Sequence, residues 1–394
     1  MTLKSIQEAE VRDKRVLVRV DFNVPLKNGR VTDDSRIRAS IPTIRSILDR
    51  GGSVILASHL GRPKGQVVED LRLAPASRRL EDLLGHPVAQ ATDVTGESAQ
   101  SLAAALRPGD VLLLENLRFD PREEKNDASL AEELSSLADL YVNDAFGAAH
   151  RAHASTTGVA SYLPAYIGLL MQSELENLGL LTDNPARPFV AVLGGAQVTD
   201  KVGVIQNLLG KVDSLLLGGG IANTFALARG QQIGESLADR DFAETAKGIL
   251  AGAEARGVMI HLPVDVVVAS EVTEKGHIVD AGAVPNGERI FDIGPETVEQ
   301  YANVLSHART VFWNGPMGVF EQPAFANGTL GVARAIAASE AFSVVGGGDS
   351  LAAIEQSGVA DQIDHLSTGG GASLEFLEGA ILPGVAALDR PEEC

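Results

Sequence analysis

Short apolar runs recur along almost the whole chain, and they constrain its fold more than any other feature. Each run is rich in Val, Leu and Ile, and helix-like stretches such as residues 129–140 and 241–257 separate one run from the next. This alternation is typical of βαβ units and predicts a mainly parallel sheet. The runs are residues 15–20, 53–58, 111–116, 140–144, 189–193, 214–218, 264–269, 310–314 and 342–346.

A boundary between two domains is expected near the middle of the chain. With 394 residues, the sequence is long for a single hydrophobic core. Residues 164–188 begin with Pro, continue as a long amphipathic stretch and end in Asn-Pro-Ala-Arg-Pro, which predicts one helix followed by a breaker. We therefore expect an α/β fold of two halves, residues 1–168 and 187–379, joined by a helix over residues 169–186.

The charge balance and the cysteine content exclude several classes of protein. A net charge of −19 argues against general binding to nucleic acids or to membrane surfaces. The first residues are charged and contain no signal-peptide core, and no apolar run approaches the ~18 residues of a membrane span. The single cysteine, Cys394, rules out an internal disulfide. We expect a cytoplasmic protein.

The predicted strands of the first half end in a set of basic and polar side chains. Asp21 and Asn23 lie two residues apart, so they share one face of an extended segment. A single Arg at a strand end is usually solvated or ion-paired, but several strand ends supplying Arg or His favour a pocket for a phosphate or carboxylate. A metal held by His150 and His153 is less favoured, because no Cys or paired carboxylate is near. The set comprises Asp21, Asn23, Arg36, Arg38, His59, Arg62, Arg118, His150, Arg151 and His153.

The second half is marked by glycine-rich turns that follow predicted strands. One such turn is usually only a tight connection, but several in one domain favour a nucleotide site, since glycine lets the backbone approach a ligand closely. No Walker A pattern and no dinucleotide fingerprint occurs, which disfavours a nucleotide-dependent dehydrogenase. The turns lie in residues 194–201, 217–225, 313–321, 344–350 and 367–375.

Three charged residues in these turns have candidate roles toward a nucleotide. Lys201 falls at a predicted helix start, where the dipole disfavours a cation, so a bound anion explains it better than stability does. Asp349 is placed to hold a Mg²⁺ that bridges phosphates, or else to cap a helix together with Ser350. Glu321 would accept from ribose hydroxyls, or else is a solvated loop acid. An anion site in one half and a nucleotide site in the other predict phosphoryl transfer.

These motifs resemble those of the phosphoglycerate kinase family in order and approximate spacing, over essentially the whole chain. They read RVDFNVP, SHLGRP, LLLENLRF, NDAFGAAHRAHAS, WNGPMGVFE, GGGDS and STGGGASLE. The resemblance implies two Rossmann-like domains with mainly parallel sheets, joined by an interdomain helix and hinge, with residues 380–394 packed on the first domain. It also implies reversible phosphoryl transfer between MgATP and 3-phosphoglycerate in glycolysis, with Mg²⁺, with ATP or ADP as co-substrate, and in a monomer.

The resemblance also assigns roles to individual residues. The substrate residues it implies are Asp21, Asn23, Arg36, His59, Arg62, Arg118 and Arg151. The nucleotide residues it implies are Gly195, Lys201, Asn314, Pro316, Glu321, Gly347, Gly348, Asp349 and Ser350, with Asp349 on the metal. Arg36, Lys201 and backbone amides at Gly348 and Gly370 would neutralise charge during a direct in-line transfer that follows domain closure.

Position 197 departs from the family pattern, because it holds Gln where the family's motif has Lys. By analogy with removal of one transition-state donor, the expected loss is about 10²–10³ in rate. A slow natural variant, an engineered substitution and compensation by a neighbouring residue all remain open. The alternative function is a weakened relative that acts mainly by binding nucleotide and phosphoglycerate.

Overall fold

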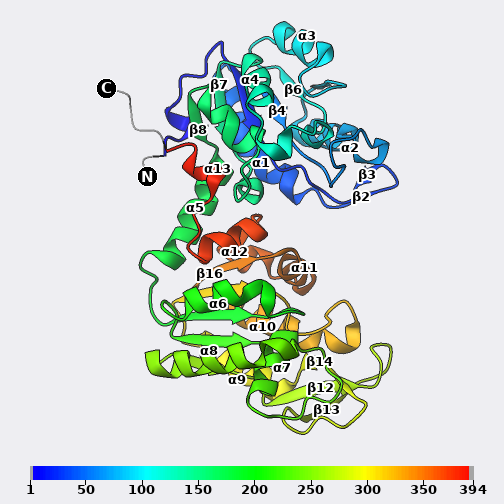
Figure 1. Cartoon of the computed structure of the whole chain (residues 1–394), viewed down its shortest axis with the longest axis vertical. Helices are drawn as coiled ribbons and strands as arrows, with labels where there is room; N and C mark the ends of the chain where they lie inside the picture. The colour runs from blue at the N-terminus through cyan, green and yellow to red at the C-terminus, as the bar shows by residue number, and fades with distance from the viewer. Residues whose placement is uncertain (1–2, 390–394) are drawn as a thin grey trace. The chain divides into compact units, whose positions relative to one another are not determined.

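The computed structural model describes residues 3–389 and consists of two compact units. The first unit runs to Glu176 and takes in the chain again from Ile381, as far as it is described, and the second unit is Asn177–Ala380. Helix α5, Leu169–Thr182, begins in the first unit and ends in the second (Figure 1). The predicted connecting helix extends to residue 186, which is wrong at its end, because α5 ends at Thr182. Pro185 follows shortly after, and a proline disfavours helical geometry in the residue before it, here Asn184.

The first unit is built on a six-stranded sheet in the order β5-β6-β4-β1-β7-β8, in which every neighbouring pair is parallel. Its central strands are apolar runs buried on both faces, as parallel sheets require. The strands are β1 Arg15–Arg19, β4 Ser53–Ala57, β5 Val88–Gln90, β6 Val111–Leu113, β7 Leu140–Asn143 and β8 Ala165–Ile167, with a small ribbon of β2 Leu26–Lys27 and β3 Arg30–Val31.

Helices of the first unit pack around this sheet with apolar faces. Helix α1 buries Ile37, Ile44 and Ile47, whose spacing puts them on one face, and it contacts β4 and α2. The helices are α1 Ser35–Leu48, α2 Ala74–Leu84, α3 Glu97–Ala105, α4 Ala128–Ser136 and α13 Pro383–Ala386. Helix α13, drawn in red in Figure 1, packs against the turn of residues 154–158.

The second unit repeats the same architecture. Its six-stranded sheet has the order β11-β10-β9-β15-β16-β17, again with parallel neighbours throughout. The strands are β9 Phe189–Leu193, β10 Ser214–Leu217, β11 Met259–His261, β15 Thr310–Asn314, β16 Phe342–Gly346 and β17 His365–Ser367. The helices are α6 Val202–Leu208, α7 Gly219–Ala228, α8 Ala243–Arg256, α9 Pro295–Ser306, α10 Asn327–Ala338, α11 Gly348–Ser357 and α12 Gly371–Leu377.

A small antiparallel sheet completes the second unit. It has the order β13-β12-β14, formed by β12 Asp265–Ala269, β13 His277–Asp280 and β14 Arg289–Ile293. The apolar run at residues 264–269 is therefore a strand, as predicted, but it lies outside the parallel sheet. None of the helices in the described part of the chain has the length and apolar character needed to cross a membrane.

Both parallel sheets reverse their strand order at one point. In the second unit the order reverses between β9 and β15, and in the first unit between β1 and β7. Loops at the carboxyl ends of strands diverge at such a point, and open α/β sheets bind their ligands there. We therefore expect ligands to bind at the residues after β1 and β7 in one unit and after β9 and β15 in the other.

Candidate functional site

The loops after β1 and β4 of the first unit and the first turn of α1 bring four predicted residues together. Asp21 is buried just past β1, and its Oδ2 accepts from Arg36 Nη1 at 2.7 Å. His59 follows β4, with its Nδ1 4.0 Å from Asp21 Oδ1. Asn23 Oδ1 accepts from the backbone N–H of Gly61 at 2.9 Å, which ties the two loops to each other.

Arg118 and Arg151 join this cluster from the loops after β6 and β7. Arg118 Nη1 donates to the carbonyl of Gly61 at 2.7 Å, and Arg151 Nε donates to His150 Nε2 at 3.0 Å. Burial and the cations of Arg19, Arg118 and Arg151 hold the pKa of His59 well below its usual range. Three of the predicted arginines, Arg36, Arg118 and Arg151, are therefore near enough to act on one imidazole, and His59 is neutral at pH 7.

His153 belongs to the same cluster. Burial, followed by the cations of Arg19 and Arg118, lowers its pKa to about 4. Within residues 3–389, no group of three or more His, Cys, Asp or Glu side chains is arranged to hold a metal ion. The Nδ1 of His153 lies 3.8 Å from Glu123 Oε1, which is beyond hydrogen-bond distance.

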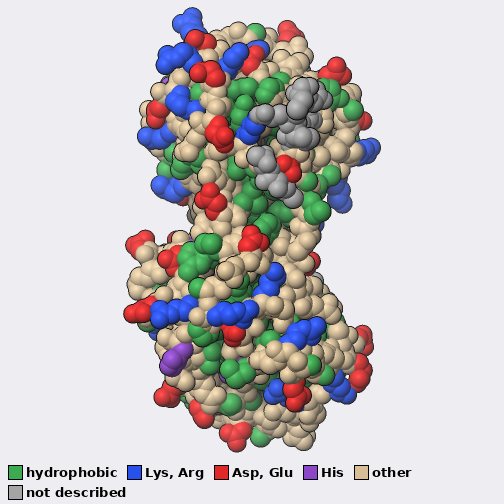
Figure 2. Space-filling model, turned by 90° about the vertical axis from the view of Figure 1, so that its left-hand side faces the viewer, with side chains coloured by type: hydrophobic (Ala, Val, Ile, Leu, Met, Phe, Trp, Pro, Cys, Tyr) green, Lys and Arg blue, Asp and Glu red, His purple; other side chains and the backbone are tan. Residues whose placement is uncertain are grey.

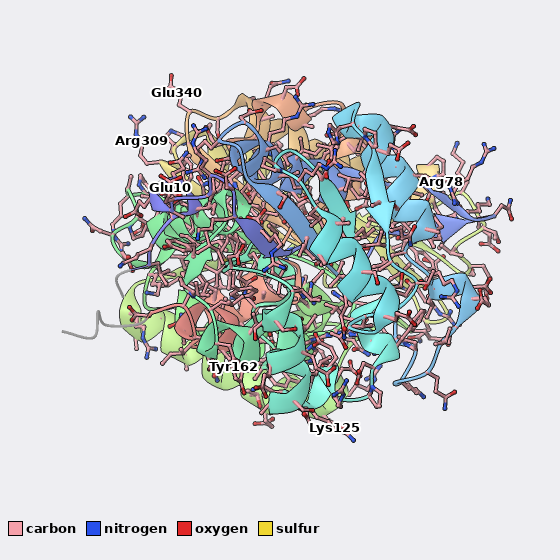
Figure 3. All side chains as sticks on the ribbon, turned by 90° about the horizontal axis from the view of Figure 1, so that it is seen from above. Glu10, Arg78, Lys125, Tyr162, Arg309 and Glu340 are labelled. Carbon is pink, nitrogen blue, oxygen red and sulfur yellow. The ribbon has the colours of Figure 1, made fainter. Side chains whose placement is uncertain are left out.

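Other arginines of the first unit differ in their surroundings. Arg62 is exposed in the same loop as Gly61, whereas Arg38 forms an exposed pair with Asp34, with its Nε 2.7 Å from Asp34 Oδ1. Arg78 projects outward at the surface, as Figure 3 shows. On the face shown in Figure 2, cationic and anionic side chains are interspersed on both units. The buried Arg118, with 4% of its surface exposed, therefore differs from these exposed arginines.

Two buried residues of this cluster were missed in the sequence. Arg19 is 1% exposed, and its Nη2 lies 3.2 Å from His59 Nδ1. Its signal was present, because it is a charged residue between Val18 and Val20 of an apolar run. Glu123 is fully buried, but it stands in the charged stretch PREEKND, which has the composition of a solvated loop.

In the second unit, the glycines after β9 and β15 allow a close approach of two backbones. The N–H of Gly194 donates to the carbonyl of Asn314 at 3.0 Å, and the N–H of Gly195 donates to Pro316 at 2.9 Å. A Cβ at Gly194 would stand 2.0 Å from the Pro316 oxygen, and Gly315 has φ +92°. Only glycine fits both demands, so these glycines are needed for the shape of the turn.

Lys201 directs its charge to this same point. It precedes α6 directly, and its Nζ donates to the carbonyls of Gly194 at 2.6 Å and Asn314 at 3.1 Å. The ammonium group therefore lies at the carboxyl ends of β9 and β15. This is the place where the reversal of strand order predicts a ligand.

Two adjoining cavities open at this place, and both lie entirely within the second unit. The smaller has a volume of about 380 Å³ and a glycine-rich wall that includes the polar residues Gln197, Lys201 and Asn314, and the larger one of about 570 Å³ has a largely apolar wall. They share Gly195, Ala196, Pro316 and Asp349. The smaller cavity is also lined by Gln197, Lys201, Asn314, Gly315, Gly347, Gly348, Ser350, Gly370, Gly371 and Leu374. The larger is also lined by Gly219, Gly220, Asn223, Glu235, Leu237, Arg289, Ile290, Phe291, Met317, Gly318, Val319 and Glu321.

Every residue predicted to bind nucleotide lines one of these two cavities. Ser350 is buried, and its Oγ accepts from the N–H of Gly315 at 2.6 Å, which fixes the turn after β15. Asp349 is exposed in the first turn of α11, whose N-cap is Gly347, so the alternative of Asp349 as N-cap is wrong. A lone exposed carboxylate fits Mg²⁺, which is usually held by one or two carboxylates together with substrate phosphates.

Few charged side chains line the smaller cavity. Gln197 is exposed and lines the smaller cavity. Among the described residues that line this cavity, Lys201 is the one cation and Asp349 the one anion. The arrangement therefore supplies backbone amides, one ammonium group and one carboxylate to a polyanionic ligand.

Known proteins are similar to this chain in sequence and in fold over nearly their full lengths. A family model described as phosphoglycerate kinase matches residues 6–380. The phosphoglycerate kinase of Moorella thermoacetica is 59% identical over 390 residues, covering 98% of this chain and 99% of the relative. That of Roseiflexus castenholzii is 58% identical over 395 residues, covering 99% and 100%. 

The same likeness extends to solved structures. The structure of phosphoglycerate kinase from Coxiella burnetii superposes with a TM-score of 0.88 at 43% identity, covering 98% of this chain and 99% of that one. The chain thus resembles these enzymes over nearly its whole length. It also has two parallel sheets, with a basic cluster at one reversal of strand order and two glycine-lined cavities at the other. It follows that the chain belongs to the phosphoglycerate kinase family.

Proposed function

We propose that this chain works as a phosphoglycerate kinase, which transfers a phosphoryl group reversibly between MgATP and the carboxylate of 3-phosphoglycerate. The observation that carries the proposal is the contrast between the two strand-order reversals. Arginines and neutral histidines gather at one, and glycine turns with one lysine line the other. An acceptor that carries a phosphate and a carboxylate suits the first, and a nucleotide suits the second.

The acceptor would bind in the first unit. Arg36, Arg62, Arg118 and Arg151 supply the two-point hydrogen bonds that phosphate and carboxylate groups favour. Because His59 is neutral at pH 7, one ring nitrogen donates a hydrogen bond without adding charge. Asp21 and Asn23 present oxygens that suit the glycerate hydroxyl.

The nucleotide would bind in the second unit. The base and ribose fit the larger cavity, where Phe291 and Met317 supply apolar wall and Glu321 an acceptor for ribose hydroxyls. The phosphates fit the smaller cavity, beside Lys201 and the first amides of α11 at Gly348 and Ser350. Asp349 would hold Mg²⁺, whose charge would offset that of the phosphates.

The reaction needs no covalent intermediate, since the acceptor carboxylate attacks the γ-phosphorus in line while the bond from that phosphorus to the bridging oxygen breaks and ADP leaves. The chain contributes position and charge: Arg36 from the first unit, and Lys201 with amides at Gly348 and Gly370 from the second. Because the two substrates would bind to separate units, transfer requires hinge bending that brings them together and excludes water. We further propose a monomer in the cytoplasm.

The direct test is the formation of ADP from MgATP with and without 3-phosphoglycerate. We expect formation that depends on 3-phosphoglycerate, and Arg118→Ala should raise KM for 3-phosphoglycerate about tenfold or more, the cost of one charge-assisted contact. Arg78→Ala, at an exposed arginine outside the cluster, is the matched control. Binding of ATP without such ADP formation would instead support the alternative of a nucleotide- and phosphoglycerate-binding protein.

A further inference from the structure

A buried carboxylate lies among the basic residues of the first unit, and the proposed chemistry does not use it. Glu123 is fully buried, and both of its oxygens accept hydrogen bonds from Ser155. The N–H of Ser155 donates to Oε2 at 3.0 Å, and the Ser155 hydroxyl donates to Oε1. Since both oxygens are acceptors, the geometry suits the ionised form of Glu123.

Ser155 joins this carboxylate to Arg19. Arg19 Nε donates to Ser155 Oγ at 2.9 Å, and Arg19 Nη2 lies 3.2 Å from His59 Nδ1. The chain of contacts therefore runs from Glu123 through Ser155 and Arg19 to His59. All four side chains are buried, with at most 5% of any residue exposed. Buried side chains held at both ends have little freedom, so a change at Glu123 should be felt at His59.

The surroundings of Glu123 act on its ionisation in both directions. Burial raises its pKa overall, and the cations of Arg19 and Arg118 and the two Ser155 hydrogen bonds offset part of that rise. His153 lies 3.8 Å away with a neutral ring at pH 7. A buried arginine without a nearby anion strongly destabilises a fold, so Arg19 depends on a carboxylate of this kind.

We propose that Glu123, acting through Ser155, is a positioning residue that holds Arg19 and His59 in the orientation required to bind the acceptor substrate. The proposal rests on the function proposed above. Glu123 touches no substrate in this scheme. Its loss should weaken binding of 3-phosphoglycerate in the first unit and leave the binding of MgATP in the second unit unchanged.

Two other roles for Glu123 predict different results. If the carboxylate only stabilised the fold, its loss would lower the unfolding temperature and leave both KM values unchanged. If it acted only through its charge, its loss would make the cluster more positive and tighten the binding of an anion. The direction of the change in KM for 3-phosphoglycerate therefore distinguishes the three roles.

The experiment compares Glu123→Gln, Ser155→Ala and the double variant with the parent full-length chain. Glu132→Gln, which removes an exposed carboxylate from α4, is the matched control. For each protein we would measure the unfolding temperature, both KM values, kcat, and the calorimetric Kd for 3-phosphoglycerate. Ser155→Ala is the smaller change and keeps the proposal testable where Glu123→Gln fails to fold.

We expect each single variant to raise KM and Kd for 3-phosphoglycerate about tenfold, with KM for MgATP and kcat within about twofold of the parent. The double variant should be no worse than the more affected single one, because both act through the same contacts. An unchanged or lower KM for 3-phosphoglycerate, or an equal rise in both KM values, would overturn the proposal. A parent chain without 3-phosphoglycerate-dependent ADP formation would overturn the proposed function instead, and the calorimetric Kd would still test Glu123.

Discussion

At the scale of single residues, the smaller cavity of the second unit is lined by very few charged side chains. Lys201 brings its ammonium to the carbonyls of Gly194 and Asn314, and Gln197 lines the same wall with a neutral amide. An amide donates hydrogen bonds but adds no charge to offset a phosphate group. The balance of charge at this wall can therefore be changed by one substitution.

Gln197→Lys should raise kcat by about 10²–10³ and change both KM values little, because a second cation would act mainly as charge shifts in the transition state. Steady-state rates of ADP formation from MgATP and 3-phosphoglycerate measure this. Gln206→Lys is the control, since it adds the same charge at an exposed position of α6 away from both cavities. Equal, high rates for the parent and Gln197→Lys would show that another group supplies the charge.

At the scale of elements, the sequence predicts the central strands well and the sheet edges poorly. Runs at residues 189–193 and 310–314 coincide with β9 and β15, which are buried along their whole length. The edge strands β5, β8, β11 and β17 have three residues each, too short for a recognisable apolar run, and were not predicted. They form because a neighbouring strand offers hydrogen bonds, which is a property of the tertiary fold.

The site shows the same division between what a sequence contains and what only folding creates. Glycine turns and strand-end arginines could be predicted, because their residue types and positions after apolar runs follow from local chemistry. Glu123 could not be predicted, because a carboxylate in a charged loop gives no local sign that the fold will bury it beside Arg19. Position 144 is a similar case, at the end of β7.

Asp144 is fully buried, and its Oδ1 accepts from the N–H groups of Leu170 at 2.9 Å and Met171 at 3.2 Å, in the first turn of α5. Burial raises its pKa to about 7, against about 3.9 in an unfolded chain. The folded form therefore retains a proton that the unfolded form has lost between these values. The resulting stability is complete below about pH 4 and is lost as the pH rises through about 7.

Asp144→Asn should remove this pH dependence while it keeps an oxygen to accept from the helix. Its stability relative to the parent should rise by about 2–3 kcal/mol between about pH 5 and pH 8. Urea unfolding at several pH values measures the difference. Asp183→Asn, at an exposed carboxylate just after the other end of α5, is the control. A difference between parent and Asp144→Asn that is the same at every pH would contradict the argument.

At the scale of the whole molecule, the chain returns to its first unit after it has completed the second. Near the end, Leu382, Val385 and Leu388 are buried, and the carbonyl of Gly384 accepts from Asn143 Nδ2 at 3.1 Å. Asn143 is the last residue of β7, next to the reversal of strand order in the first unit. The last segment thus supports the strand that ends at the proposed acceptor site.

Truncation after Ala380 should destabilise the first unit and weaken 3-phosphoglycerate binding, because three buried apolar side chains and the bond to Asn143 are lost. Hydrogen exchange followed by peptide should show faster exchange in β7 and in the turn of residues 154–158, with β9 and β15 unaffected. Truncation after Asp389 leaves these contacts in place and is the control. Faster exchange throughout both units would argue against a local role.

The second unit contains both cavities and a hydrophobic core of its own. All residues that line its two cavities fall within 177–380, and Trp313 and Tyr301 are buried in a hydrophobic core of its own. A fragment of residues 177–380 should therefore fold and bind MgADP within about threefold of the Kd of the full chain, since every residue that lines the two cavities is kept. It should form no ADP from MgATP with 3-phosphoglycerate, because it has no acceptor site.

Calorimetry on the fragment and on the full chain tests this, with circular dichroism as the check on folding. Lys201→Ala in both should weaken binding by the same factor, because the Lys201 ammonium donates to two carbonyls of its own unit. A folded fragment that no longer binds MgADP would mean that the first unit contributes to the nucleotide site. Nucleotide binding and acceptor binding would then be coupled before transfer. The assignment of the nucleotide to the second unit alone and of the acceptor to the first unit alone would then be wrong.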